Sequence, residues 1–287
     1  MKTIIESLEK FVLTTDKDKS SHWKYHLKEK NYRDIFKNMG FGNYSKKNNF
    51  KSPFHKIFQK IIFGTKVFKT SEFLAYKEIY DSMDRQIDVD TVRHIFTFKM
   101  LKNFIFPNKI VVIGDGKANF VLGAIKLFDR SQIYSINLAE TLINDYLIIN
   151  KSGLIKDSDI QVIKSLDDKI LSEKKLILIP SNLKNVLLNS NVELFVNIAS
   201  FQEMNNEEIN NYFDIIKNNK SLLYSCNREK KILQGGENLV FKDYPWGNGK
   251  KIFFENCGWH QRFYIFKPPF IKKYDGNIMH CLIDYSK

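Results

Sequence analysis

The sequence lacks a long apolar segment, an export signal and a metal-type pattern of cysteines. No apolar run approaches the roughly 20 residues that a membrane-spanning helix needs. The N-terminal stretch mixes acidic and basic residues with its apolar ones, which argues against a signal peptide. We therefore expect a cytoplasmic protein. Cys226, Cys257 and Cys281 show no zinc-type spacing, so we expect reduced thiols and no metal site.

Arginine is scarce beside lysine, although the formal net charge is +13. A basic surface suits an anionic partner, such as nucleic acid, a nucleotide sugar or the inner face of a membrane. Arginine makes the better bidentate contacts to phosphates and bases, so its scarcity disfavours nucleic acid. AT-rich coding would also produce a chain crowded with lysine and asparagine, without any selection for binding.

The chain of 287 residues, with 43% hydrophobic and 14% aromatic residues, is long and apolar enough for a substantial core. Residues 1–106 are predicted to be mainly helical and to cap a site or mediate homodimerisation. In residues 107–287, strand-like and helix-like segments alternate, which predicts a parallel sheet with helices on both faces. "QRFYIFKPP" and "NIMHCLIDYS" are expected to add antiparallel strands at the end of this α/β domain.

A glycine loop lies in "NKIVVIGDGKANFVLGAIKLF", where a buried-type strand meets a helix. Gly114 and Gly116 allow a tight turn and a close approach to a ligand, and Asp115 lies between them. Ala118 and Asn119 stand where the dinucleotide pattern has its third glycine. Since Asp115 would also repel a phosphate, the loop disfavours NAD and suits a cofactor without phosphate.

Polar residues follow the next two predicted strands at their carboxyl ends, where this fold binds ligands. Asn137, followed by Leu138, is predicted to bond ribose hydroxyls, although it could instead be a strand-end turn residue. Ser181 and Asn182 follow "LILIP" and are placed for an adenine contact.

The stretch "LFVNIASFQEMNNEEINNYFDII", residues 194–216, is the most specific of the chain. It resembles the sugar O-methyltransferases, a bacterial branch of the class I S-adenosylmethionine-dependent enzymes. "LLYSCNRE" and "NLAETL" agree with that family in order and spacing, so the resemblance covers roughly residues 85–287. It implies a Rossmann-like class I methyltransferase sheet, S-adenosylmethionine as cofactor with Ser200 beside it, and a sugar hydroxyl as methyl acceptor. The substrate would be a nucleotide sugar or a surface glycan.

Three positions depart from the family pattern: Val112 and Asn137 replace acidic residues, and Ala118 replaces the third glycine. A non-catalytic binding or scaffold protein of the same fold therefore remains an alternative. An RNA methyltransferase is another, favoured by the net charge if basic side chains line the cleft. The lysines that would form such a stripe are Lys46, Lys47, Lys51, Lys56 and Lys60.

Methyl transfer to a sugar hydroxyl benefits from a general base, because the hydroxyl is a poor nucleophile near neutral pH. Glu203, after the fourth predicted strand, and His260, in "ENCGWHQRF", are the two candidates. A helix-capping carboxylate and a packing histidine are their structural alternatives. His94 is expected to be an ordinary helix-face residue.

The segment between residues 228 and 260 is long for a plain connection. Tyr244 and Trp246, flanked by glycines, are predicted to stack on a sugar ring as part of a lid, or to belong to an ordinary loop. Asn227 and Arg228 are predicted to hold sugar hydroxyls or a phosphate.

Overall fold

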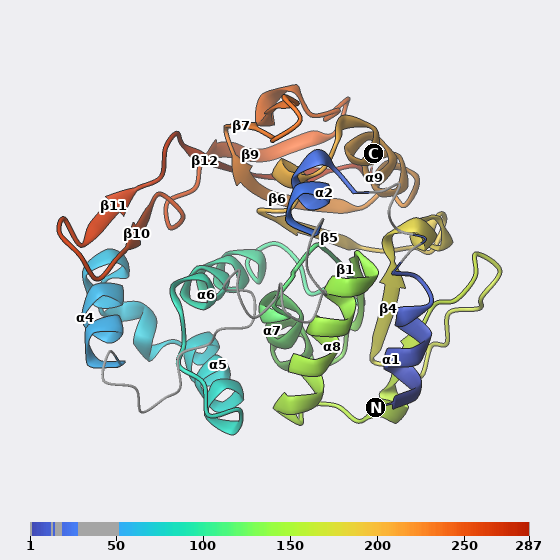
Figure 1. The fold of residues 1–287 in the computed structure, drawn as a ribbon, viewed down its shortest axis with the longest axis horizontal. Helices are drawn as coiled ribbons and strands as arrows, with labels where there is room; N and C mark the ends of the chain where they lie inside the picture. Colours follow the sequence, from blue (N-terminus) through green and yellow to red (C-terminus); the bar gives the residue numbers. More distant parts are fainter. Residues whose placement is uncertain (1, 13, 15–18, 28–51, 287) are drawn as a thin grey trace.

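The computed structural model describes residues 2–12, 14, 19–27 and 52–286 (Figure 1). Its main sheet consists of β1 (Lys109–Ile113), β2 (Gln132–Asn137), β3 (Ile160–Val162), β4 (Leu176–Pro180), β5 (Leu194–Ile198), β6 (Leu222–Arg228), β9 (Lys250–Asn256) and β12 (Ile278–Asp284). The helices are α1 (Lys2–Glu9), α2 (Ser21–Leu27), α4 (Ser52–Phe63), α5 (Ser71–Ser82), α6 (Val89–Leu101), α7 (Asn119–Leu127), α8 (Ala139–Ser152) and α9 (Asn206–Asn218).

The strands lie in the order β3-β4-β2-β1-β5-β6-β12-β9. Strands β1 to β6 pair in parallel, while β12 lies antiparallel between β6 and β9. This arrangement confirms the predicted Rossmann-like class I methyltransferase sheet with antiparallel C-terminal strands. The order reverses at β1, since the chain first builds outward through β2 and then crosses to β5. Ligands bind such sheets beside this switch point.

The side chains of each strand point alternately to the two faces of the sheet, so the core has two layers. In β1, Ile110 and Val112 pack with α5, α6, α7 and α8, whereas Val111 and Ile113 pack with α9 on the other face. Successive side chains of a strand point to opposite faces, so a strand buried on both sides reads as an unbroken apolar run. Figure 1 shows the two groups of helices on either side of the sheet.

The described helices before residue 107 share the core of the sheet. Tyr76 of α5 and Phe98 of α6 belong to the same buried cluster as Ile110 of β1 and Phe120 of α7. Phe98 stacks on Phe120 with ring centroids 4.3 Å apart. The boundary predicted at residue 106 thus falls in a loop, while the apolar core continues across it. No helix of the described ranges is long and apolar enough to cross a membrane.

The helix predicted after β5 is confirmed as α9, and local chemistry explains its start. Asn205 is its N-cap, and the Asn205 side chain accepts a hydrogen bond from the Glu208 backbone N–H at 2.8 Å. Glu207 and Glu208 lie in the first turn, where carboxylates interact favourably with the helix dipole.

Two predictions about the last third of the chain were wrong. "QRFYIFKPP" does not join the main sheet, because β10 (Arg262–Tyr264) pairs with β11 (Ile271–Lys273) in a separate hairpin that packs on α4. The strand beside β12 is instead β9, from the segment predicted to be a loop. Its side chains are mostly exposed, as expected for an edge strand, so it lacks the apolar run that reveals a buried one.

Candidate active site

A cavity of about 360 Å³ opens at the carboxyl ends of β1, β2, β5 and β6. The last residues of these strands and the loops that follow them form its wall. Trp23 of α2 and residues of α6 also line it. The volume lies in the range of small-molecule and cofactor sites. The cavity occupies the switch point, where the sequence predicted the ligand.

The glycine loop of this cavity has the backbone that the sequence predicted. Gly114 and Gly116 have φ of +74° and +72°, values that favour glycine. A Cβ on Gly114 would lie 1.9 Å from Ser200 Oγ, so the loop after β1 and the loop after β5 touch there. Gly114, Gly116 and Ser200 all line the cavity. Ala118, in the place of the third glycine, has a left-handed φ of +52°.

Asp115 also lines the cavity, but its carboxylate is used by the protein. Asp115 Oδ2 accepts a hydrogen bond from the Val121 backbone N–H at 2.7 Å and so caps the first turn of α7. Burial raises the pKa of Asp115 to about 6, although hydrogen bonds from the helix amides oppose this shift. This side chain therefore shapes the loop by holding α7.

Sequence reasoning missed a second buried carboxyl beneath the loop, Asp145 of α8. Its Oδ1 accepts a hydrogen bond from the Ala118 backbone N–H at 2.8 Å, which fixes the left-handed turn. Burial, and secondarily the adjacent charge of Asp115, hold the pKa of Asp145 well above its usual range. No short sequence pattern could have found the pair, because Asp115 and Asp145 come from different elements.

Two unsatisfied polar atoms face the end of β2. Asn137 Oδ1 accepts a hydrogen bond from the Leu138 backbone N–H at 3.0 Å. Asn137 Nδ2 is buried and makes no hydrogen bond of ordinary length to a described residue, although the Asn137 side chain lies near enough to Asp145 to lower the pKa of that carboxyl. Thr141 Oγ1 is also buried without a hydrogen-bond partner among the described residues. Asn137, Leu138 and Thr141 all line the cavity. Because buried polar groups are normally hydrogen-bonded, these atoms indicate a ligand that carries hydroxyls.

The residues predicted for adenine separate in the structure. Ser181 lines the cavity at the end of β4. Asn182 follows it in the 3₁₀ turn η4 (Ser181–Leu187) and is not among the lining residues. Within the described part of the chain, the prediction for Asn182 is therefore not supported.

Glu203, one of the two predicted bases, lies in the 3₁₀ turn η5 (Phe201–Glu203) and lines the cavity. Its Oε1 is 2.9 Å from Lys231 Nζ, and its Oε2 is 3.8 Å from His22 Nε2. Both carboxylate oxygens therefore face cationic or potentially cationic groups. The Glu203 carboxylate is therefore engaged by side chains of the protein on both of its oxygens.

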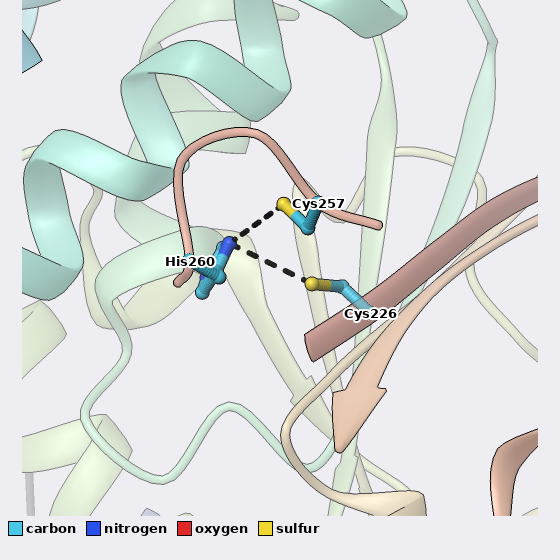
Figure 2. Close-up of side chains that lie close together, drawn as sticks. All are labelled: Cys226, Cys257 and His260. Atoms are coloured by element: carbon cyan, nitrogen blue, oxygen red, sulfur yellow. Dashed lines mark hydrogen bonds between the residues drawn. The ribbon is translucent and has the colours of Figure 1, made fainter. Parts of the chain in front are cut away.

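His260, the other predicted base, lines the cavity and is 8% exposed. Its Nδ1 lies 3.1 Å from Cys257 Sγ and 3.6 Å from Cys226 Sγ (Figure 2). Burial lowers the pKa of His260, although the Cys257 sulfur opposes this shift, so the imidazole is neutral at neutral pH. A neutral imidazole can accept a proton, and His260 is thus the better placed of the two.

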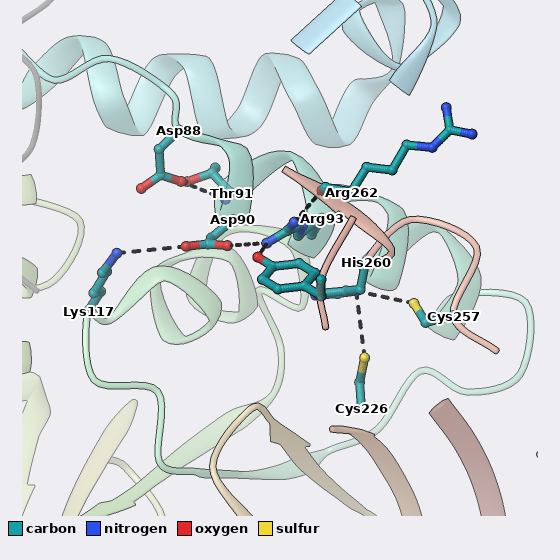
Figure 3. Close-up of polar contacts among 10 residues, drawn as sticks. Asp88, Asp90, Thr91, Arg93, Lys117, Cys226, Cys257, His260 and Arg262 are labelled. Atoms are coloured by element: carbon teal, nitrogen blue, oxygen red, sulfur yellow. Dashed lines mark hydrogen bonds and ion pairs between the residues drawn. The ribbon is translucent and has the colours of Figure 1, made fainter. Parts of the chain in front are cut away.

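A charged network on α6 faces His260 and was missed by sequence reasoning (Figure 3). Arg93 Nη1 donates to Asp90 Oδ1 at 2.7 Å and to Tyr274 Oη at 2.9 Å. Lys117 Nζ lies 3.7 Å from Asp90 Oδ2. Burial alone would raise the pKa of Asp90, but Arg93 and Lys117 hold it well below its usual range. The Asp90 carboxylate therefore stays ionised beside the cavity.

His94 belongs to the same face of α6, contrary to the expectation of an ordinary helix-face residue. Asp90, Arg93 and His94 are spaced by three and four residues, and all three line the cavity. Burial lowers the pKa of His94 to about 3, so its ring is neutral. The spacing D-x-x-R-H in "VDTVRHIF" was the available signal, and it requires a prior reason to expect this helix at the site.

The predicted sugar-binding residues divide into two groups. Arg228 lines the cavity, with its guanidinium 5.5 Å from the centroid of the Tyr274 ring. Asn227 also lines it, but its amide serves the scaffold: Nδ2 donates to Asn197 Oδ1 and to Ser225 Oγ, both at 2.9 Å. Of these two residues, Arg228 is therefore the one whose side chain is better placed to contact a ligand.

Tyr244 and Trp246 do not form a lid, so that prediction was wrong. Each is 6% exposed, belongs to the core cluster beneath α9, and is absent from the lining of the cavity. Trp246 Nε1 donates to the Phe241 backbone carbonyl at 2.9 Å, and its ring packs edge-on against Phe213 at 5.1 Å. Glycines beside aromatic side chains therefore do not show that a segment is exposed, because a turn that leads into the core can also require glycine.

Comparison with known proteins found similarity to solved structures but none by sequence. No model of a known protein family matches the sequence, and no curated protein matches it. A SAM dependent methyltransferase from Aquifex aeolicus is 14% identical, with 75% of this chain and 100% of that chain covered and a TM-score of 0.38. A structure titled as cofactor-bound Rv0187 from MTB is 10% identical, with 83% and 98% covered and a TM-score of 0.43.

A SAM-dependent O-methyltransferase from Thermotoga maritima is 12% identical, with 67% of this chain and 64% of that chain covered and a TM-score of 0.38. Neither the identities nor the scores bear on activity or substrate. The fold class rests on the strand order of the chain itself.

Proposed function

We propose that the chain is a cytoplasmic S-adenosylmethionine-dependent O-methyltransferase acting on a sugar hydroxyl of a nucleotide sugar or a surface glycan. The observation that carries the proposal is that one cavity has two unlike halves. One half holds the glycine loop and the orphaned Asn137 Nδ2 and Thr141 Oγ1. The other holds the charged and aromatic groups around His260.

The first half fits the cofactor. Gly114 and Gly116 let the backbone approach the ligand, and Asn137 and Thr141 offer hydrogen bonds to ribose hydroxyls. Ser181 lies at the next strand end, where an adenine contact belongs. When bound, S-adenosylmethionine supplies an electrophilic methyl carbon on a sulfonium sulfur.

The second half supports a polyhydroxylated, anionic acceptor. Asp90 can accept hydrogen bonds from hydroxyls, Arg228 can bind a phosphate or an acidic sugar, and Tyr274 offers an aromatic face. His260 is the residue that would take the proton of the reacting hydroxyl, because it is neutral, buried and part of the cavity wall. Trp23 of α2 adds a further aromatic side chain to the lining of the cavity.

The proposal is tested first by calorimetric titration with S-adenosylhomocysteine, with NAD as the control ligand. Micromolar binding of the homocysteine compound alone is expected. Transfer of a labelled methyl group to nucleotide sugars, with RNA as the comparison acceptor, then tests the substrate class. The absence of binding at millimolar ligand would overturn the proposal in favour of a non-catalytic scaffold.

Two matched variants separate the predicted bases. His260→Gln is expected to lose turnover while keeping its affinity for S-adenosylhomocysteine. Glu203→Gln is expected to retain most turnover, since the Glu203 carboxylate is paired with Lys231. The reverse order of the two effects would assign the base to Glu203.

The RNA methyltransferase alternative has no specific support from the described residues. Lys46, Lys47 and Lys51 lie outside them. Lys56 and Lys60 are exposed on α4, which packs on the β10 hairpin and does not line the cavity. Methylation of RNA in preference to sugars, with a steep salt dependence, would favour this alternative.

A further inference from the structure

We propose that Cys226, Cys257 and His260 bind a Zn²⁺ ion at the wall of the cavity, with one coordination position open to it. This site goes beyond the proposed methyl transfer and does not depend on it. The sulfur atoms of both cysteines and a ring nitrogen of the histidine lie within 4.8 Å of one another (Figure 2). Thiolate and imidazole ligands together are typical of zinc.

The distances match those of a tetrahedral centre. With Zn–S bonds of about 2.3 Å and Zn–N bonds of about 2.0–2.1 Å, adjacent sulfur and nitrogen ligands lie about 3.6 Å apart. His260 Nδ1 is 3.6 Å from Cys226 Sγ and 3.1 Å from Cys257 Sγ. One edge already has the required length, and the other must open by about half an ångström.

The ligands are buried and held by independent contacts. Cys226 lies in β6, in register with His280 of β12, and is 1% exposed. Cys257 is fully buried, and its backbone N–H donates to the Ile278 carbonyl at 2.8 Å. Gln261, next to His260, donates from Nε2 to the Cys257 and Ile278 carbonyls at 2.8 and 2.7 Å. The turn that carries Cys257 and His260 is therefore fixed to the sheet before any ion binds.

The other side of the turn is fixed as well. Trp259 Nε1 donates to Thr97 Oγ1 of α6 at 3.3 Å, and its ring stacks on Phe96 at 5.7 Å. A site whose ligands are preorganised in this way loses little conformational entropy when it binds a metal. Two thiolates also neutralise the divalent charge, as a buried site requires.

The fourth coordination position of the ion would lie toward the cavity, because two of its three protein ligands line that cavity. Cys226 and His260 line the cavity, whereas Cys257 lies behind them. An ion on these three ligands would be reached through the cavity and would have its fourth position there, free for water or a hydroxyl of a ligand. Three protein ligands with one open position are the pattern of catalytic zinc, as opposed to closed structural zinc.

Occupation of the site would change the role of His260. Its Nδ1 would bind the ion, and the bound oxygen would become more acidic through the metal. This consequence alone rests on the proposed function, because only that function identifies the oxygen as the acceptor hydroxyl.

No local pattern of the sequence indicates this site. The ligands come from β6 and from the turn after β9, and only Cys257 and His260 form a short C-x-x-H spacing. The expectation of ordinary thiols without a metal is thus replaced by a proposal that the folded chain alone makes visible.

Cobalt substitution tests the site. Full-length protein is stripped of metal under reducing conditions, titrated with Co²⁺ and then with Zn²⁺, and followed by absorption and by elemental analysis. We expect one metal per chain, thiolate-to-cobalt charge-transfer bands, the strong visible bands of tetrahedral Co²⁺, and their loss on addition of Zn²⁺. Octahedral Co²⁺ spectra without charge-transfer bands would overturn the proposal.

The variants are Cys226→Ser, Cys257→Ser and His260→Gln, with Cys281→Ser as the matched control. Cys281 is also fully buried but lies on β12 outside the cluster. We expect at least a tenfold loss of Zn²⁺ affinity in the first three and none in the control. If a cluster variant fails to fold, judged by circular dichroism, the cobalt spectrum of the wild type still decides. A Cys226–Cys257 disulfide that persists in reductant, with no metal bound, would also overturn the proposal.

The same variants distinguish this proposal from the proposed function. Binding of S-adenosylhomocysteine reports on the other half of the cavity and is expected to survive in all four. Loss of zinc with retained methyl transfer would remove only the link to the bound oxygen. Binding of zinc without any methyl transfer would leave the site and overturn the activity.

Discussion

Replacement of Asn137 by alanine is expected to lower both the stability of the protein and its affinity for the ligand, through different atoms of the same side chain. Asn137 Oδ1 accepts a hydrogen bond from the Leu138 N–H. Asn137 Nδ2 lies near the Asp145 carboxyl but makes no hydrogen bond of ordinary length within the described part of the chain. The variant loses the first bond in both the free and the bound protein. It loses the second bond only where a ligand supplies an acceptor.

The oxygen and the nitrogen of the Asn137 amide therefore contribute separately, the first to stability and the second to ligand affinity. Loss of the bond to Leu138 is expected to lower the free energy of unfolding by about 1 kcal/mol, which corresponds to a fall in Tm of about 2 °C for a chain of this size. Loss of the bond to ribose is expected to cost about 1–2 kcal/mol of binding, a decrease of about 5- to 30-fold in affinity for S-adenosylhomocysteine.

Calorimetric titration and thermal unfolding measure the two effects, and Asn182→Ala is the matched control. Asn182 carries the same side chain just after the neighbouring strand β4, has a buried Oδ1 without a partner among the described residues, and does not line the cavity. Its replacement is expected to leave the affinity unchanged. Equal affinities of wild type and Asn137→Ala would refute the assignment of Asn137 to the ligand.

Three further perturbations test the packing and charge around the site. Burial raises the pKa of Asp115 from 3.8 to about 6, so the contribution of this carboxyl to the free energy of unfolding is full below pH 3.8 and falls by up to about 3 kcal/mol as the pH rises to 6. The free energy of unfolding of Asp115→Asn, measured with urea, should therefore depend less steeply on pH across this range than that of the wild type, and an unchanged slope would contradict the assignment of the shift to Asp115. Gly123→Ala would place a Cβ 2.0 Å from a buried tyrosine oxygen, so we expect a loss of about 1–3 kcal/mol despite the better helix former, while Gly258→Ala, with open space around it, should be neutral in the same thermal assay. Lys19→Met should cost about 3–5 kcal/mol because it leaves Glu140, 2.6 Å from Lys19 Nζ, as an unpaired buried charge; a double variant with Glu140→Met that is no more stable than the single one would argue against that pair.

The parallel core was predictable because its strands carry their own signal. A strand buried on both faces is apolar at successive positions, as β1 and β4 are, and β2 and β5 each interrupt that run with one buried polar residue, Ser135 and Asn197. The edge strand β9 was not predictable in this way, since its environment does not demand apolar residues on both faces. Its position becomes clear only from its pairing with β12.

The cavity was partly predictable because strand ends meet at one edge of a parallel sheet. Gly114, Asn137, Ser181 and Ser200 all reach the cavity, as their places after the strands predict. The groups from α6 and the cysteines around His260 were not predictable, because no rule of spacing connects elements that only tertiary packing brings together.

The same limit explains the errors in the aromatic segment. Tyr244 lies between glycines and near a proline, the composition of an exposed loop. In the fold, this short segment turns beneath α9 and fills a gap between ring systems. Composition describes the backbone of such a segment, while its burial depends on which apolar surface lies opposite.

The position of β12 between β6 and β9 has a consequence for co-translational folding. β12 follows every other strand of the sheet along the chain, yet it bonds to two of them. Until residue 284 has emerged, β6 keeps one edge without its partner and β9 has no place in the sheet. The nascent chain therefore holds an open sheet edge until β12 has emerged, and an unpaired edge of this kind is prone to aggregation.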